Sequence, residues 1–262
     1  MFFDNTILQI NNKIMKKTTR LVAFIAAMLC LPMASKAQNL QVLYDTNREC
    51  ITTTFEMFRP DAFGSTFIFV DMDYATNSVV KGRAVGAYTE IAREFCFWQD
   101  SKLGWLSAHA EFNGGLAGAF SFNNAWLLGA TYSGHSKDFS KTWSVTASYK
   151  AIPGLEDING KCRMHNFQLT GVWGINFFKG WCSFSGFADF WQEHQDYVRA
   201  DGSIASAEFI FIAEPQLWVN LNKIKGMENV NLSLGGELEL SNNFGGSEGF
   251  YARPAFGAKW TF

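Results

Sequence analysis

The final residues of the chain alternate between apolar and polar side chains. Between positions 250 and 262, one set of positions is apolar and ends on Phe262, whereas the other set includes Arg253 and Lys259. This alternation predicts a β-strand with two different faces, because successive side chains of a strand point to opposite sides. Such a strand is typical of a transmembrane barrel, whose outside contacts lipid while its inside stays wet. The edge strand of a soluble sandwich would alternate in the same way, so the rest of the chain has to distinguish the two.

The same period of two recurs along the chain from residue 39 onward. It is clearest at 140–150, where Trp143 and Val145 share one face while Ser144 and Thr146 share the other. A helix cannot keep those two sets apart. The pattern predicts about twelve strands, which we expect at 39–45, 50–58, 64–74, 86–97, 104–113, 122–132, 140–150, 165–175, 181–191, 206–221, 230–240 and 250–262.

Composition restricts how this chain could enter a membrane. After residue 38, no apolar run exceeds about five residues, whereas a transmembrane helix needs about twenty. Insertion would therefore use strands, whose apolar content is hidden by alternation. A net charge of −2 and a pI near 6.1 argue against a nucleic-acid partner or a strongly anionic one.

The first 37 residues predict export from the cytoplasm. A basic start at Met15 is followed by an apolar stretch over 21–31, which is too short to span a bilayer. Small residues at Ser35 and Ala37 then suit cleavage before Gln38. We therefore interpret 1–37 as an upstream extension plus a cleaved secretory signal peptide. Residues 38–262 are expected to be one barrel in the bacterial outer membrane, in contact with its lipid.

The lengths of the expected connections also favour a closed barrel. With both ends of the mature chain in the periplasm, short turns should alternate with longer outer loops. The short connections are 59–63, 98–103, 133–139, 176–180 and 222–229. The longer outer loops include 75–85, 151–164 and 192–205.

If the apolar face of each strand meets lipid, the interior of the barrel is acidic. Carboxylates that line a watery channel favour cations or neutral polar solutes and disfavour phosphates. In the alternative interpretation, an inward network of salt bridges fills the barrel and nothing passes. The expected inward acids are Glu56, Asp71, Asp73, Glu90, Glu94, Glu111, Asp189, Glu208, Glu214, Glu237 and Glu239, opposed by Lys150, Arg253 and Lys259.

Short segments of the first strands resemble a known family. The run Thr52 to Phe58, a short turn, and the run Phe67 to Asp71 are similar to the opening strands of the nucleoside-specific channel-forming outer-membrane proteins, the Tsx-like family. The run Tyr88 to Arg93 resembles the next strand of that family. The resemblance implies a barrel of about twelve strands with a narrow pore. It does not establish the solute, but it raises nucleosides above other solutes. Of the family's binding residues, only those that match Glu56 and Asp71 can be placed in this sequence.

Some aromatic side chains also fall on the inward face. Next to carboxylates, Phe67 and Phe69 could form a stacking shelf for a planar base that carries a sugar. Aromatic residues near strand ends, such as Trp181 and Trp191, are more typical of interfacial girdles. The same parity also turns Phe58, Phe187, Trp218 and Tyr251 inward. The candidate pore-lining residues are Glu56, Phe67, Phe69, Asp71, Asp73, Glu90, Glu111 and Arg253.

One arginine conflicts with this assignment of faces. Arg93 shares the lipid face with Ile91, where an arginine at mid-bilayer would cost roughly 2–4 kcal/mol. We predict either a bulge near Ala92 that returns Arg93 to the interior, or a strand end from which its guanidinium reaches water.

Other classes of function find weaker support in the sequence. Outer-membrane lipases also use barrels of about twelve strands, but only His165 could face lipid, and no serine with a nucleophile motif is placed near it. No catalytic residue, metal site or cofactor is expected, and His194 is interpreted as part of a solvated loop. The mature cysteines are expected to be free. A second interpretation is kept beside the channel. In it, the barrel is closed and meets an extracellular partner, such as a phage, at the outer loops 151–164 and 192–205.

Overall fold

A computed structural model describes residues 38–75, 82–117, 120–121 and 124–262. The expected upstream extension and signal peptide, residues 1–37, lie outside the described residues. The described strands are β1 (Gln38–Asp45), β2 (Cys50–Asp61), β3 (Gly64–Tyr74), β4 (Ala84–Phe95), β5 (Leu106–Ala117), β6 (Phe120–Ser121), β7 (Ala125–His135), β8 (Lys141–Ala151), β9 (His165–Phe177), β10 (Cys182–Val198), β11 (Ile204–Ala213), β12 (Gln216–Asn220), β13 (Leu232–Asn242) and β14 (Phe250–Thr261). Two 3₁₀ turns, η1 (Phe178–Gly180) and η2 (Leu221–Lys223), follow β9 and β12.

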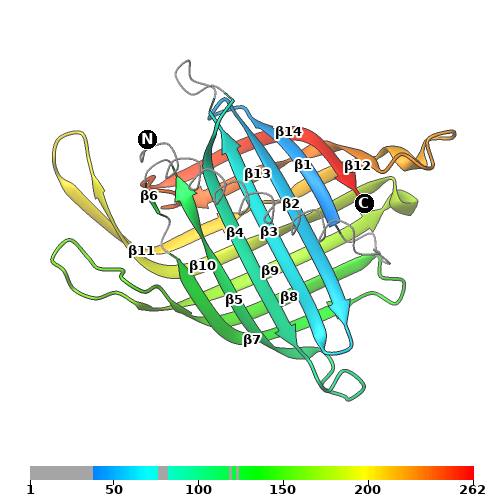
Figure 1. Ribbon diagram of the computed structural model, residues 1–262, viewed down its shortest axis with the longest axis horizontal. Coiled ribbons are helices and arrows are strands. Elements are labelled where there is room, and N and C mark those ends of the chain that lie inside the picture. The colour runs from blue at the N-terminus through cyan, green and yellow to red at the C-terminus, as the bar shows by residue number, and fades with distance from the viewer. Residues whose placement is uncertain (1–37, 76–81, 118–119, 122–123) are drawn as a thin grey trace, which may run out of the picture. The chain divides into compact units, whose positions relative to one another are not determined.

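The strands form a closed antiparallel barrel (Figure 1). Each wall strand pairs with its neighbours in the chain, and β1 pairs with β14, so that the ring has no open edge. The two-residue β6 pairs only with β5, and β11 and β12 share one place in the wall, because β10 and β13 pair with both. The described residues therefore build a barrel of twelve wall strands, which confirms the predicted fold class.

The two rims of the barrel differ in their connections. The described chain begins and ends at one rim, where the Phe262 backbone N–H donates to the Gln38 carbonyl at 3.0 Å. We call this the terminal rim; it also carries the connections 62–63, 96–105, 136–140, 178–181 and 221–231. The opposite rim carries 46–49, 152–164, 199–203 and 243–249; β3 and β5 also end there, and β4 and β7 begin there.

The predicted outer loop at 192–205 is wrong. β10 continues to Val198, and only 199–203 connects it to β11. The pairing with β11 shifts register between Gln192 and Gln195, which indicates a β-bulge. Because the extra residue interrupts the period of two, the run Glu193-His194 resembles a polar loop in the sequence. In the barrel, both side chains are buried.

The predicted strand at 206–221 is interrupted where β11 ends and β12 begins. Glu214 and Pro215 separate the two halves, and proline cannot donate to a sheet ladder. On β10, Gly186 faces this interruption with φ +152°, which is a backbone conformation that L side chains rarely adopt. The strand ladder is therefore interrupted at a point where both strands carry a residue suited to irregular backbone.

We expect Gly186→Ala to destabilise the barrel by about 1–3 kcal/mol, because alanine would be strained at this φ and its Cβ would lie 2.2 Å from the Glu214 carbonyl oxygen. Gly171→Ala in β9 is the matched control, since its added Cβ meets only the Ala188 carbonyl oxygen, at 3.9 Å. Urea unfolding of each detergent-purified variant, followed by heat-dependent gel mobility, gives the two unfolding midpoints. Equal unfolding midpoints for the two variants would contradict the expectation.

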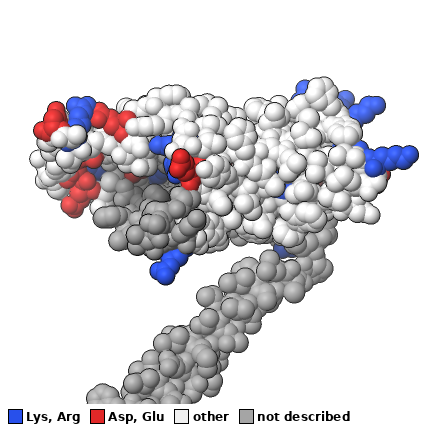
Figure 2. Space-filling view, turned by 90° about the horizontal axis from the view of Figure 1, so that it is seen from above, with Lys and Arg blue, Asp and Glu red and all other residues white. Residues whose placement is uncertain are grey.

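The outside of the wall is apolar. Outward positions carry exposed aliphatic and aromatic side chains, and neighbouring strands stack their rings: Phe190 and Phe209 lie 5.5 Å apart between ring centres. On the face that Figure 2 shows, most charged side chains gather at the two ends of the barrel. No helix among the described residues is long and apolar enough to cross a bilayer.

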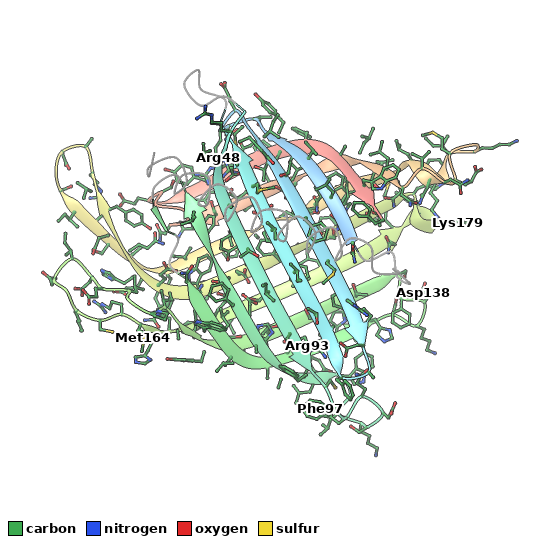
Figure 3. The ribbon with its side chains drawn as sticks, viewed as in Figure 1. Arg48, Arg93, Phe97, Asp138, Met164 and Lys179 are labelled. Atoms are coloured by element: carbon green, nitrogen blue, oxygen red, sulfur yellow. The ribbon has the colours of Figure 1, made fainter. Side chains whose placement is uncertain are left out.

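Arg93 reaches the terminal rim from the end of β4. The pairing of β3 with β4 shows no register shift near Ala92, so the predicted bulge is wrong. Arg93 lies near the end of β4, as the alternative prediction states. Its guanidinium donates to Asp61 at 2.6 Å and to Thr66 at 3.0 Å. Figure 3 shows Arg93 and Arg48 at opposite ends of the barrel. The expectation of free cysteines is confirmed for Cys50, Cys96, Cys162 and Cys182.

Candidate functional site

The predicted pore-lining residues of β2 and β3 lie side by side on the interior face. Glu56 accepts a hydrogen bond from the Asn39 amide at 2.8 Å. The hydroxyl of Thr54 donates to Asp71, and that of Thr52 donates to Asp73 at 2.6 Å. Each of these carboxylates therefore has a neutral donor, which leaves its negative charge in the interior uncompensated by that contact.

Phe67 and Phe69 continue this surface with two stacked rings, 6.5 Å apart between centres. The ring of Tyr88, on β4, meets Phe69 edge-on at 6.4 Å. Phe69 is also the direct cross-strand neighbour of Glu56. The aromatic rings and the carboxylates of the predicted shelf thus lie side by side, and contact of the shelf with a solute stays a prediction.

Of the other three predicted residues, Glu90 is the direct cross-strand neighbour of Phe69, whereas Glu111 and Arg253 belong to other strands. Glu90 accepts a hydrogen bond from the Tyr88 hydroxyl at 2.9 Å. Glu111, on β5, accepts from the Asn113 amide at 3.0 Å. Arg253, on β14, pairs with Glu239 at 2.5 Å, so that its positive charge is locally compensated.

The lumen also contains two lysine–tryptophan pairs that the sequence analysis did not identify. The Lys150 ammonium lies 4.4 Å from the centre of the Trp191 ring, and the Lys259 ammonium lies 4.4 Å from that of Trp218. Trp191 is buried within β10 rather than at its end, which corrects its interpretation as an interfacial residue, whereas Trp181 is exposed at the terminal rim. Strand parity places these tryptophans inward, but it does not show which lysine lies over which ring.

Carboxylates from opposite walls approach one another inside the barrel. Glu90 of β4 and Glu111 of β5 act electrostatically on Asp189 of β10. In a second group, Asp71 of β3 acts on Glu237 of β13. Cations compensate several interior acids: Arg48 pairs with Asp45 at 2.6 Å, and His109 pairs with Glu94 at 2.6 Å and with Glu111 at 3.3 Å. Carboxylates therefore outnumber the cations beside them, and the interior of the barrel is acidic.

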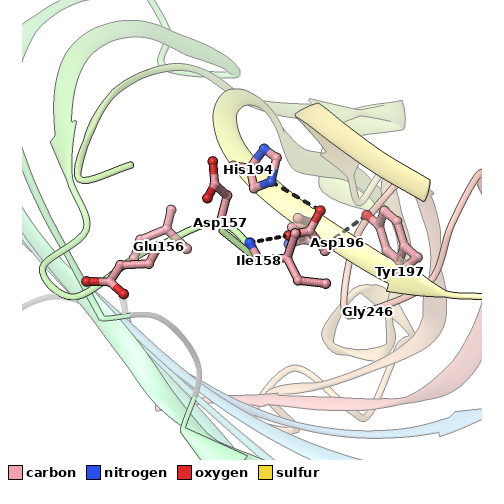
Figure 4. A pocket seen from close by; sticks show the side chains of 9 residues that line it. Glu156, Asp157, Ile158, His194, Asp196, Tyr197 and Gly246 are labelled. Carbon is pink, nitrogen blue, oxygen red and sulfur yellow. Dashed lines mark hydrogen bonds and ion pairs between the residues drawn. The ribbon is translucent and has the colours of Figure 1, made fainter. Parts of the chain in front are cut away.

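A separate pocket of about 430 Å³ opens at the opposite rim (Figure 4). His194 lies between Glu208, at 2.9 Å, and Asp196, at 3.2 Å. In the loop 152–164, the backbone N–H of Lys161 donates a hydrogen bond to the Asp157 carboxylate, and this bond is the main cause of the lowered pKa of Asp157. The pocket is lined by Leu155, Glu156, Asp157, Ile158, His194, Gln195, Asp196, Tyr197 and Gly246.

These positions correct the prediction for His194, which is a buried strand residue and not part of a solvated loop. His165 lies at the outside of the wall, where its Nδ1 is hydrogen-bonded to the Tyr149 hydroxyl at 2.5 Å. That nitrogen is thus engaged by a tyrosine and not by a serine nucleophile. Among the described residues, no group of three or more His, Cys, Asp or Glu side chains could hold a metal ion.

The fold is similar to that of a solved porin structure. The NanC porin superposes with a TM-score of 0.53 at 9% sequence identity, covering 86% of this chain and 99% of the porin. The beta domain of the Bordetella autotransporter Brka gives a TM-score of 0.34 at 12% identity, covering 86% of this chain and 97% of that domain. No curated protein matches the sequence. Residues 37–262 match the family described as Domain of unknown function (DUF5020), and the chain belongs to that family.

Proposed function

We propose that this protein is an outer-membrane channel through which small polar solutes diffuse passively. The observation that carries the proposal is a closed barrel with an apolar outside and an acidic inside. An exposed apolar wall is unfavourable in water, whereas a lipid bilayer would cover it with apolar chains. The interior carboxylates favour cations and neutral polar solutes over phosphates.

Nucleosides are the solute that we propose within that class. The stacked rings of Phe67 and Phe69 offer a face for a planar base. The neighbouring carboxylates of Glu56 and Asp71 can accept hydrogen bonds from sugar hydroxyls. The resemblance of these strands to the Tsx-like family points to the same solute.

The channel is tested in a planar bilayer with the mature protein, purified from outer membranes after expression of the full chain. We expect stepwise currents whose reversal potential in a KCl gradient shows a preference for K⁺, and partial block by added nucleosides. Asp71→Ala should weaken both the cation preference and the block, because it removes a carboxylate from the shelf. Asp138→Ala, in the exposed turn 136–140, is the control that removes one charge outside the lumen.

A folded barrel that passes no current would contradict the channel and favour the second candidate, a closed structural or receptor barrel. That candidate is supported by the tight packing of part of the interior, where Ile210 and Trp218 have no exposed surface. Its extracellular partner would then meet the loop 152–164 and the pocket beside it. Currents without nucleoside block would retain the channel and exclude nucleosides as its solute.

A further inference from the structure

Asp189 has an unsatisfied carboxylate oxygen inside the barrel. The side chain lies on the interior face of β10 and is 8% exposed. Thr170 and Gln168, on the neighbouring β9, are its hydrogen-bond partners. Its Oδ1 nevertheless has no hydrogen-bond partner among the described residues. A buried carboxylate oxygen without a donor is costly, and such an atom often marks a position where a ligand or an ion supplies the missing contact.

Four further residues surround this carboxylate, and with Asp189 they form what we call the Asp189 cluster: Glu90, Glu111, Lys150 and Trp191. Glu90 and Glu111 come from the wall across the lumen, and both act on Asp189 through their charge. Trp191 shares β10 with Asp189, and Lys150 comes from β8, which lies midway between β5 and β10 in the wall. Three carboxylates of the cluster thus share a single ammonium. Glu111 is also paired with His109 at 3.3 Å, and Glu193 adds a further negative charge that acts on Lys150. Acids still outnumber cations, so the cluster as a whole attracts a further positive charge.

Lys150 shows how an ammonium is accommodated at this place. Its Nζ donates to the Gln168 Oε1 at 2.9 Å and lies 4.4 Å from the centre of the Trp191 ring. Both partners are neutral. An amine is therefore held here by one amide acceptor and one aromatic face, although carboxylates lie nearby. A tethered ammonium of this kind can be displaced by a free one that binds the same face and also reaches the unsatisfied oxygen.

We propose that the Asp189 cluster binds the primary ammonium group of small organic cations that pass through the barrel, with Lys150 as a tethered competitor. This inference rests on the proposed channel function and names a second class of solute for it. An ammonium supplies N–H donors to Asp189 Oδ1 and a positive charge to the cluster, and its alkyl part packs on Trp191. A metal ion fits less well, because the described carboxylates do not converge into a metal-holding group.

The experiment measures block of the K⁺ current by n-butylammonium in the planar bilayer. The wild-type channel should be blocked in a concentration-dependent manner, and tetramethylammonium, which has no N–H donors, should block more weakly. Asp189→Asn should raise the half-blocking concentration of n-butylammonium about tenfold or more, which corresponds to about 1.4 kcal/mol. Lys150→Met should lower it several-fold, because the competing ammonium is removed while an unbranched side chain only one atom shorter is kept. Asp201→Asn, in the rim loop 199–203, removes one charge outside the lumen as the control.

The outcomes separate this inference from the function on which it rests. A wild-type barrel without current would overturn the channel itself. A conducting channel whose block is the same in wild type, Asp189→Asn and Lys150→Met would leave the channel standing and overturn the ammonium site. If Asp189→Asn does not fold, as judged by its heat-dependent gel mobility, Lys150→Met decides alone: unchanged or weaker block in that variant would contradict the proposal.

Discussion

Trp218→Ala is expected to lower the free energy of unfolding of the barrel by about 3–5 kcal/mol, the usual cost of removing a buried tryptophan ring. The Trp218 side chain has no exposed surface and packs against Leu43 and Ala255 in the interior. Its indole N–H donates to the Gln216 side chain at 3.0 Å, and its ring lies under the Lys259 ammonium. The substitution would leave a void and would deprive the half-buried Lys259 ammonium of its aromatic partner.

Trp126→Ala is the matched control for this prediction, because the Trp126 ring lies on the outside of the wall and is 56% exposed. Urea unfolding in lipid vesicles, followed by tryptophan fluorescence or by gel mobility, compares the two variants on one scale. Trp218→Phe, which keeps a ring but loses the indole N–H, should fall between wild type and Trp218→Ala. A Trp218→Ala barrel as stable as the Trp126→Ala barrel would show that the interior near Trp218 is not tightly packed.

The second large effect concerns the outside of the wall. Val145→Arg should destabilise the membrane-inserted barrel by roughly 2–4 kcal/mol, because an arginine at the centre of the lipid face loses its hydration. Val145 lies in the middle of β8 on an outward position and is 53% exposed. Its neighbours in the adjacent strands are Tyr132 and Gly171, which offer no carboxylate to pair with a guanidinium.

Val198→Arg provides the comparison, since Val198 is the last residue of β10, at the rim, and is also exposed. Near the membrane interface the cost should fall to about 0–1 kcal/mol. Vesicle-reconstituted variants are unfolded in urea, and their unfolding free energies are compared. Equal, small effects at both positions would show that the middle of the wall is not covered by lipid, and would remove the main support for an outer-membrane location.

Much of the candidate site follows from strand parity. Asp71, Asp73 and Glu90 face inward as predicted, because each lies in a strand that keeps a regular period of two across the wall. Parity fails at His194, where the bulge in β10 adds one residue and shifts the alternation. It also does not show how far a side chain reaches, so it could not identify Lys150 as the partner of the Trp191 ring on a strand that is not its neighbour.

The sequence by itself determined the number of wall strands, the two faces of each and the acidic character of the inside. These properties are local, because a strand separates its faces within a few residues and lipid requires the apolar face to be continuous. Only the tertiary structure decided that Asp189 interacts with Glu90 and Glu111, that Trp218 lies under Lys259, and that the ladder is interrupted opposite Gly186. Those arrangements depend on the registers that close the ring, and closure brings together strands that are far apart in the chain.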